Sequence, residues 1–201
     1  MKTILITQKI EFNSDANQRM DCLDQRWVKF LSDCNYISLL VPNNMQALLK
    51  IIELVKVDGI ILSGGNDLDI FGGGVPERDL VERFLIEYGI NNHVPVLGIC
   101  RGMQIIQQYF DVPLHGIEGH VGNHFIDSIY GTKEVNSYHN YGSRDTVSDL
   151  QVLARSGDGI VECFIHSNRL VMGIMWHPER EDERDVEFTK GLIMRFMSLE
   201  L

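Results

Sequence analysis

The sequence has few basic residues and no long apolar run, and each shortage excludes a class of protein. Its 201 residues include 18 Lys and Arg against 28 Asp and Glu, a formal net charge of −10. That balance argues against general binding to nucleic acid or to an anionic membrane surface, although a pocket can still be locally basic. No apolar stretch approaches the ~20 residues of a membrane-spanning helix. We therefore expect neither a nucleic-acid nor a membrane partner.

Cysteine is also scarce, and its spacing indicates no metal or redox chemistry. The chain has four cysteines, none in a CxxC pair: Cys22, Cys34, Cys100 and Cys163. This pattern suggests neither a zinc site nor a redox pair. The N-terminus becomes polar too early for a signal peptide. We expect a reducing, cytoplasmic setting, with no metal and no cofactor.

The composition is that of a folded globular protein. The apolar fraction is 44% and the mean hydropathy is −0.05, which does not fit a disordered chain. We find no internal repeat, low-complexity stretch or evident linker. One domain over residues 1–201 is the simplest expectation.

The first half of the chain alternates between short apolar runs and segments of helical periodicity. The predicted strands are 3–7, 36–41, 58–62 and 94–99, and the predicted helices are about 16–34, 45–55, 77–91 and 103–110. Such an alternation predicts a parallel sheet with helices on both faces. In these sheets ligands bind at the carboxyl ends of the strands, where the loops after residues 62 and 99 lie. The glycine-containing loop 68–76 is flexible or tightly turned.

The second half of the chain has a different character. Residues 113–132 are rich in Gly and His. Shorter, partly antiparallel strands are predicted at 134–138, 151–155, 160–166 and 170–176, and a helix at 185–201. The fold class is therefore α/β, with a mainly parallel central sheet and a smaller antiparallel addition in the C-terminal half.

A cysteine between a predicted strand and a predicted helix forms the clearest chemical motif. Gly98 lies two residues before Cys100 and Gly102 two residues after it. A Gly-x-Cys-x-Gly in this position is the thiol counterpart of the Gly-x-Ser-x-Gly nucleophile elbow, whose glycines allow a sharp turn and close approach of a substrate. At the N-terminus of a helix, unpaired N–H groups favour a thiolate. A buried structural cysteine is the alternative, but it would need no glycine on each side.

A thiol nucleophile needs a base, and the base needs a group that orients it. Among the seven histidines, His177 follows the apolar run 170–176 and precedes Pro178, which forces a turn at the carboxyl edge of the sheet. Glu179 lies close enough in sequence to bond the far ring nitrogen. The sequence predicts Cys100, His177 and Glu179 as nucleophile, base and orienting group. The alternative is that His177 is an ordinary loop histidine.

Catalysis at a carbonyl also needs hydrogen-bond donors for the developing oxyanion. The N–H of Arg101 directly follows the candidate nucleophile, and the N–H of Gly65 lies in the loop after the strand at 58–62. We predict that these two groups form an oxyanion hole. A plain tight turn is the alternative interpretation of Gly64 and Gly65.

Five segments carry a resemblance to a known family. They are 63–67 (Ser-Gly-Gly-Asn-Asp), 78–79 (Arg-Asp), 98–104 (Gly-Ile-Cys-Arg-Gly-Met-Gln), 135–139 (Val-Asn-Ser-Tyr-His) and 176–179 (Trp-His-Pro-Glu). Together they resemble the class I glutamine amidotransferases and, within them, the γ-glutamyl-γ-aminobutyrate hydrolase branch, peptidase family C26. The resemblance implies a flavodoxin-like three-layer fold, the triad Cys100, His177 and Glu179, and the oxyanion hole of Gly65 and Arg101.

The resemblance also implies substrate contacts. The implied residues are Gly64, Asn66, Gln104, Ser137, Tyr138 and His139. Gln104 matches a position that commonly contacts the glutamyl moiety, and residues 137–139 match the segment that lines the glutamyl pocket. A satisfied surface histidine is the alternative for His139. His120 and His124 resemble a Gly-His…His segment of this branch, for which structural hydrogen bonding is expected.

The resemblance is specific for chemistry and not for the amine half of the substrate. It implies a hydrolase of small γ-glutamyl amides that forms a cysteine-bound glutamyl thioester and releases glutamate. The other product would be γ-aminobutyrate or the phosphoramidate of γ-glutamyl-CDP-amidate. Residues 68–74 lack the Pro and Tyr often found there in the family. Two alternatives are a glutaminase subunit that delivers ammonia to a synthase and a non-catalytic binding protein. A homo-oligomer or a synthase partner is compatible with the sequence.

Overall fold

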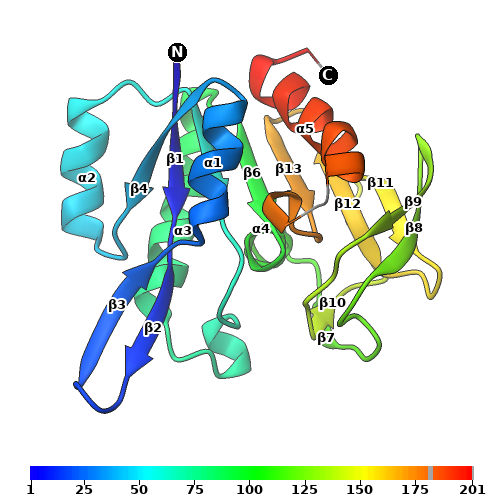
Figure 1. Ribbon diagram of the computed structural model, residues 1–201, viewed down its shortest axis with the longest axis horizontal. Helices are drawn as coiled ribbons and strands as arrows, with labels where there is room; N and C mark the ends of the chain where they lie inside the picture. Colours follow the sequence, from blue (N-terminus) through cyan, green and yellow to red (C-terminus); the bar gives the residue numbers. More distant parts are fainter. Residues whose placement is uncertain (181–182, 201) are drawn as a thin grey trace.

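The computed structural model describes residues 1–180 and 183–200, and one large sheet runs through it. The strands of this sheet are β1 (Lys2–Thr7), β4 (Tyr36–Val41), β5 (Gly59–Leu62), β6 (Val96–Ile99), β8 (His124–Ser128), β9 (Gly131–Val135), β11 (Leu150–Ser156), β12 (Val161–His166) and β13 (Val171–Ile174). They lie in the order β4-β1-β5-β6-β13-β12-β11-β8-β9 (Figure 1). Two small sheets pair β2 (Lys9–Asn13) with β3 (Gln18–Cys22), and β7 (His115–Gly116) with β10 (Tyr141–Gly142).

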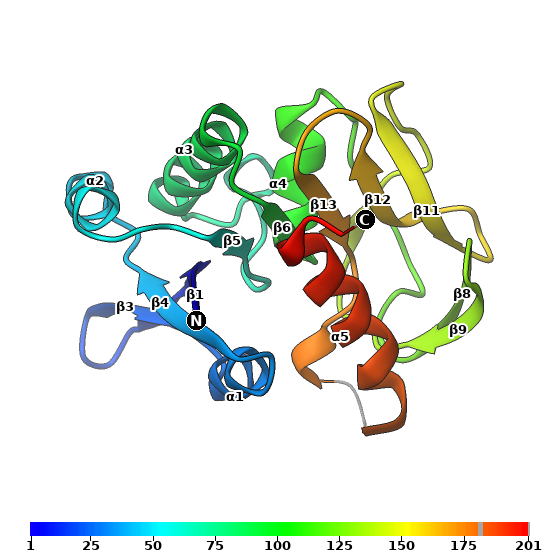
Figure 2. The same cartoon turned by 90° about the horizontal axis from the view of Figure 1, so that it is seen from above.

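Helices cover both faces of the sheet, which gives the predicted three layers. On one face lie α1 (Gln25–Asp33) and α5 (Glu183–Ser198), and on the other lie α2 (Met45–Leu54), α3 (Pro76–Asn92) and α4 (Arg101–Tyr109) (Figure 2). Each face has its own apolar core. Trp27 and Phe196 belong to the first core, and Leu48, Leu85 and Ile106 belong to the second. No helix in the described part of the chain is long and apolar enough to cross a membrane.

The parallel half of the sheet brings several loops to one edge. β4, β1, β5, β6 and β13 are parallel neighbours. The side chains of β5, β6 and β13 are all buried because helices cover both faces of the sheet there. Leu62 pairs with Gly98, and Ile174 pairs with Ile99. The chain segments that leave β5, β6 and β13 therefore start side by side, as the sequence predicted for the first two.

The antiparallel half continues the same sheet beyond β13. β12, β11, β8 and β9 follow as antiparallel neighbours. The predicted strand at 134–138 was wrong in its bounds, because β9 ends at Val135 and residues 136–139 form a loop. β8 was not predicted, because its segment was characterised only by its Gly and His content. The predicted C-terminal helix corresponds to α5, and residue 201 lies outside the described residues.

The predicted helix at 16–34 was wrong over its first part. Residues 9–22 form the β2–β3 hairpin, in which Lys9 pairs with Cys22 and Asn13 pairs with Gln18. The turn is possible because Asn17 adopts a left-handed backbone with φ 49°. Helix α1 begins only after Asp24, whose side chain accepts a hydrogen bond from the N–H of Arg26.

The loop after β5 is tightly turned. It contains a short 3₁₀ helix at Asp69–Phe71, and a side chain at Gly73 would place its Cβ only 2.0 Å from the carbonyl oxygen of Asp67. The ring of Phe71 stacks on Tyr141, with 4.0 Å between ring centroids and a 5° interplanar angle. This stack holds the loop against β10, at the edge where the functional residues gather.

Candidate active site

Cys100 forms a sharp turn between β6 and α4. Its backbone has φ 52° and ψ −107°, a sparsely populated conformation that costs ~1–3 kcal/mol. Its N–H donates to the carbonyl oxygen of Ile174 at 2.8 Å, which fixes the turn to the neighbouring strand. The cysteine therefore sits directly at the N-terminus of a helix that starts at Arg101.

The two flanking glycines allow close packing rather than the turn itself. A Cβ at Gly98 would lie 2.3 Å from the carbonyl oxygen of Gly102, and a Cβ at Gly102 would lie 2.0 Å from that of Leu62. The left-handed φ belongs to Cys100, whereas neither glycine has a positive φ. Our expectation that the glycines supply the sharp turn was therefore wrong, although both positions do require glycine.

His177 and Glu179 lie together after β13. Nδ1 of His177 is 2.8 Å from Oε1 of Glu179, and both residues are buried. Asn136 fixes the histidine backbone from the other side: its Oδ1 accepts from the His177 N–H, and its Nδ2 donates to the His177 carbonyl oxygen, each at 2.9 Å. The sequence analysis gave Asn136 no role, although the residue lies within a segment that carried the resemblance.

The imidazole of His177 faces Cys100. A Cβ placed on Gly64 would lie 2.6 Å from Cε1 of His177 and 3.5 Å from Cβ of Cys100, so both side chains border this glycine. Burial lowers the pKa of His177, but hydrogen bonding to Cys100 and Glu179 outweighs burial and raises the pKa to about 9. The imidazole of His177 is therefore protonated at neutral pH and can donate a proton.

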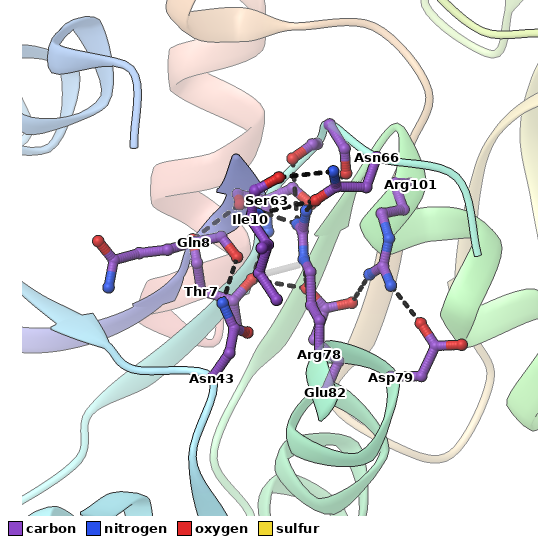
Figure 3. A network of polar contacts seen from close by, with 12 residues as sticks. Thr7, Gln8, Ile10, Asn43, Ser63, Asn66, Arg78, Asp79, Glu82 and Arg101 are labelled. Atoms are coloured by element: carbon purple, nitrogen blue, oxygen red, sulfur yellow. Dashed lines mark hydrogen bonds and ion pairs between the residues drawn. The ribbon is translucent and has the colours of Figure 1, made fainter. Parts of the chain in front are cut away.

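Arg78 holds the loop that carries the predicted oxyanion donor. From α3 its fully buried guanidinium donates to the carbonyl oxygens of Ser63 at 2.7 Å, Gly64 at 3.0 Å and Gly65 at 2.5 Å (Figure 3). With the carbonyls turned towards Arg78, Gly65 adopts a left-handed φ of 83°. Among the described residues, the N–H groups of Gly65 and Arg101 have no hydrogen-bond acceptor. Both groups can therefore bind an oxyanion.

A carboxylate between two arginines completes this network. Glu82 is fully buried, bonds Arg78 Nε at 2.9 Å and contacts Nη1 of Arg101, whose Nη2 contacts Asp79 (Figure 3). Burial raises the pKa of Glu82, but Arg101 and Arg78 outweigh burial and hold the pKa below its ordinary value. The side chain of Arg101 thus fixes α4 to α3 below the elbow and is not aimed at a substrate.

Two cavities meet at His177. The first, of about 260 Å³, is lined by Cys100, Arg101, Gln104 and Tyr138 among others. The second, of about 320 Å³, lies towards the β2–β3 hairpin and is lined by Lys9, Glu11, Cys22, Trp27 and Gly64 among others. Gly65, His177 and Arg180 line both. A substrate with two halves could therefore place one half on each side of the imidazole.

Four of the predicted substrate-binding residues line the first cavity, and Gly64 lines the second: the four are Asn66, Gln104, Tyr138 and His139. Gln104 lines this cavity while its Nε2 donates to the carbonyl oxygen of Tyr141 at 2.9 Å, and Tyr138 packs edge-on against His177. Asn66 bonds the backbone of Ile10, so it holds the hairpin base.

Two further predicted side chains serve the fold around the cavity. Oγ of Ser137 donates to the carbonyl oxygen of His120 at 2.6 Å. The ring of His139 lies 3.0 Å from the Tyr141 carbonyl oxygen through Nδ1, and its Nε2 faces Glu162 at 3.5 Å. His139 is among the residues that line the first cavity, whereas Ser137 is not.

Comparison with known proteins identifies the family. The peptidase C26 family model matches residues 4–179. The chain belongs to this family. It is 34% identical over 184 residues to the γ-glutamyl-CDP-amidate hydrolase of Campylobacter jejuni. This alignment covers 88% of this chain and 90% of the relative.

Two further matches agree with this assignment. The γ-glutamyl-γ-aminobutyrate hydrolase of Escherichia coli O157:H7 is 27% identical over 63% of this chain and 65% of its own length. The crystal structure of a glutamine amidotransferase from Thermotoga maritima superposes with a TM-score of 0.72 at 14% identity, covering 99% of this chain and 97% of that one. The family and the flavodoxin-like α/β fold predicted from the sequence are confirmed.

Proposed function

We propose that this peptidase C26 member hydrolyses the γ-glutamyl amide bond of a small molecule, with Cys100, His177 and Glu179 as its catalytic triad. One observation carries the proposal above all: a strained backbone elbow presents Cys100 to a histidine that a buried carboxylate orients at 2.8 Å. Family membership supports hydrolysis of a C–N bond of this type.

The geometry allows a two-step reaction. The Cys100 thiolate attacks the side-chain carbonyl carbon of the glutamyl group, and the N–H groups of Gly65 and Arg101 bind the oxyanion. Protonated His177 gives its proton to the departing nitrogen as the C–N bond breaks, leaving a glutamyl thioester. His177 then takes a proton from water, which attacks the thioester and releases glutamate and the thiolate. Glu179 keeps the imidazole in one orientation throughout.

The two cavities support an assignment of the two substrate halves. We infer that the glutamyl group occupies the cavity beside Gln104 and Tyr138, and that the leaving group occupies the larger cavity beside the hairpin. The larger cavity is lined by the cations Lys9 and Arg180 and by the carboxylates Glu11, Asp24 and Glu179. Either cation can bind an anionic group of the leaving half. The volume of about 320 Å³ and the 34% identical relative named γ-glutamyl-CDP-amidate hydrolase support a nucleotide phosphoramidate as the leaving group.

The test combines intact-protein mass spectrometry with glutamate release. Wild type and Cys100→Ala are incubated with glutamine, γ-glutamyl-γ-aminobutyrate and γ-glutamyl-CDP-amidate. We expect a glutamyl adduct that requires Cys100, and fastest turnover of the phosphoramidate. Turnover by Cys100→Ala would refute the nucleophile assignment, and turnover of glutamine only after a synthase is added would favour a glutaminase subunit.

Lys9→Ala separates the two halves of the substrate, because Lys9 lines the larger cavity and not the first. If Lys9 binds the leaving group, this variant should raise KM for the phosphoramidate more than for γ-glutamyl-γ-aminobutyrate. An equal loss with both substrates would contradict the assignment of the larger cavity without affecting the triad.

A further inference from the structure

Three histidines and one carboxylate converge behind the wall of the first cavity. His120 and His124 come from the segment that leads into β8, His139 from the loop before β10, and Glu162 from β12. Oε1 of Glu162 lies 3.2 Å from Nδ1 of His120, 3.5 Å from Nε2 of His124 and 3.5 Å from Nε2 of His139. Nitrogen atoms of three histidines thus face the same oxygen of Glu162.

These atoms are buried, and hydrogen bonds do not satisfy them. The side chain of Glu162 is 1% exposed and that of His139 is 1% exposed. Despite the short distances, the facing nitrogens of the three histidines and both oxygens of Glu162 have no hydrogen-bond partner in the described chain. Buried polar groups nearly always have a partner, so these five atoms favour a ligand that they can share.

In His120 and His139, the ring nitrogen that points away from Glu162 faces an oxygen acceptor. This arrangement favours the tautomers that a metal ion requires. Nδ1 of His139 faces the carbonyl oxygen of Tyr141 at 3.0 Å, and Nε2 of His120 lies 3.3 Å from Oδ1 of Asp158. Asp158 is itself held by a hydrogen bond of 2.6 Å from Oγ of Ser156. Each outer nitrogen can therefore donate its proton to a fixed acceptor, which leaves the lone pair of each inner nitrogen available to a metal ion, as in carboxylate–histidine–zinc arrangements.

The spacing of the ligand atoms fits a small tetrahedral ion. With metal–ligand bonds of ~2.0–2.1 Å, neighbouring ligand atoms of a tetrahedral zinc site lie ~3.3 Å apart. The three distances from Glu162 are 3.2, 3.5 and 3.5 Å, and the ligand atoms of His120, His139 and Glu162 all lie within 4.8 Å of one another. Imidazole nitrogens with one carboxylate are a donor set that suits zinc.

We propose that His120, His139 and Glu162 bind one Zn²⁺ ion, and that His124, whose Nε2 lies 3.5 Å from Glu162, turns inward as the fourth ligand that closes this structural site. The expectation from the sequence was that the chain holds no metal, because the cysteine spacing gave no zinc motif. This site uses no cysteine, and its four ligands are spread over residues 120–162. It is independent of the catalytic proposal, because the reaction on Cys100 needs no metal.

The ion would fix the segment that positions the catalytic histidine. His120 already bonds this segment: its carbonyl oxygen accepts from the Ser137 hydroxyl at 2.6 Å and from the His139 N–H at 3.2 Å. Asn136, which precedes Ser137, holds the backbone of His177. The carbonyl oxygen of Glu162 accepts from the N–H of Met175, two residues before His177. One ion would thus link the two sets of hydrogen bonds that lead to His177, one through Asn136 and the other through Met175.

Metal uptake by the whole protein is the test. Wild type is purified, stripped with EDTA, checked for an unchanged circular dichroism spectrum, and titrated with Zn²⁺ against a chromophoric chelator. We expect one Zn²⁺ per chain, and the same stoichiometry by inductively coupled plasma mass spectrometry before stripping. Co²⁺ in its place should give the visible d–d bands of a tetrahedral site without a thiolate-to-cobalt charge-transfer band.

Variants assign the ion to this cluster. Glu162→Gln and His139→Ala should lose uptake. Asp158→Asn, which within the cluster contacts only the outer nitrogen of His120, should weaken uptake ~10–100-fold. Cys100→Ala and His115→Ala, which changes an exposed histidine outside the cluster, should bind as wild type does. Folded, stripped wild type that takes up no Zn²⁺ would overturn the proposal. Loss of uptake in Cys100→Ala would also overturn it, because the ion would then sit at the catalytic cysteine.

Discussion

Glu82→Gln should lower the stability of the protein much more than its small change in side-chain shape suggests. Glu82 is the fully buried carboxylate between Arg78, which is fully buried, and Arg101, which is 1% exposed. After the substitution, Asp79 is the one carboxylate left beside two buried guanidinium groups. Removing one partner of a buried ion pair costs about 3–5 kcal/mol because a charge stays buried without compensation. That is a large part of the ~5–15 kcal/mol by which a folded domain is stable.

Urea and thermal unfolding measure the effect. For a chain of this size the expected loss lowers the melting temperature by ~6–20 °C, at ~2–4 °C per kcal/mol. The matched control is Glu77→Gln on the same helix. Glu77 pairs with Arg19 at the surface, where ion pairs contribute little, so this variant should melt close to wild type. Equal stabilities of the two variants would refute the charge argument.

The pH dependence gives a second check on the same residue. The pKa of Glu82 is below its ordinary value in the folded protein. Its contribution is therefore fully present above its unfolded pKa of 4.5 and is lost as the pH falls through the folded value. The difference in stability between wild type and Glu82→Gln should shrink in acid. A difference that is constant from pH 7 to acid conditions would mean that packing, and not charge, explains the loss.

Four further predictions concern the catalytic histidine, the elbow and the thiols. In Cys100→Ala the pKa of His177, raised to about 9 in the wild type, should fall, because a partner that favours the imidazolium is gone; NMR titration of the ring protons measures this. The wild-type stability that comes from protonated His177 should be present below pH 6.5 and lost as the pH rises through about 9. Gly102→Ala should give insoluble or unfolded protein, since its Cβ would lie 2.0 Å from a backbone oxygen; a soluble variant with wild-type melting would contradict the close packing. Burial raises the pKa of Cys34 to about 11 and also raises that of Cys163. At pH 7.5 iodoacetamide should therefore modify Cys100 much faster than either of them. Peptide mapping measures the three rates, and equal rates would contradict this prediction.

The parallel half of the fold was predictable from the sequence because its physics is local. Apolar runs such as residues 58–62 and 94–99 are long enough to mark buried strands, and each ends at a polar or glycine-rich turn. The β–α alternation then implies a parallel sheet whose loops share one edge, so the convergence of Cys100, His177 and the loop at Gly65 could be expected from the sequence alone. The hairpin at 9–22 escaped because residues such as Cys22 and Leu23 continue the helical spacing of α1.

Contacts between distant polar residues were not predictable in this way. Arg78 was noted only as part of a resemblance, and nothing in its neighbourhood says that it donates to three carbonyl groups of the loop at 63–65. Glu162 lies in an apolar strand, and its histidine neighbours are 23 to 42 positions earlier in the sequence. Their proximity is set by the antiparallel order of β12, β11 and β8, which short-range periodicity does not encode. An acidic residue inside an otherwise apolar strand was the one visible hint.

The β2–β3 hairpin gives the molecule a separable part. It forms its own small sheet, projects from the main sheet after β1, and is held at its base by two hydrogen bonds between Asn66 and Ile10. Three of its residues line the larger cavity. The elbow, the triad and the arginine network lie outside the hairpin, in the main sheet, its helices and its loops. Insertions, deletions or substitutions in this arm can therefore reshape one side of the cavity while the reacting groups keep their places. Proteins with this fold can therefore change the leaving group that they accept by changing a hairpin of about a dozen residues, while the catalytic residues stay the same.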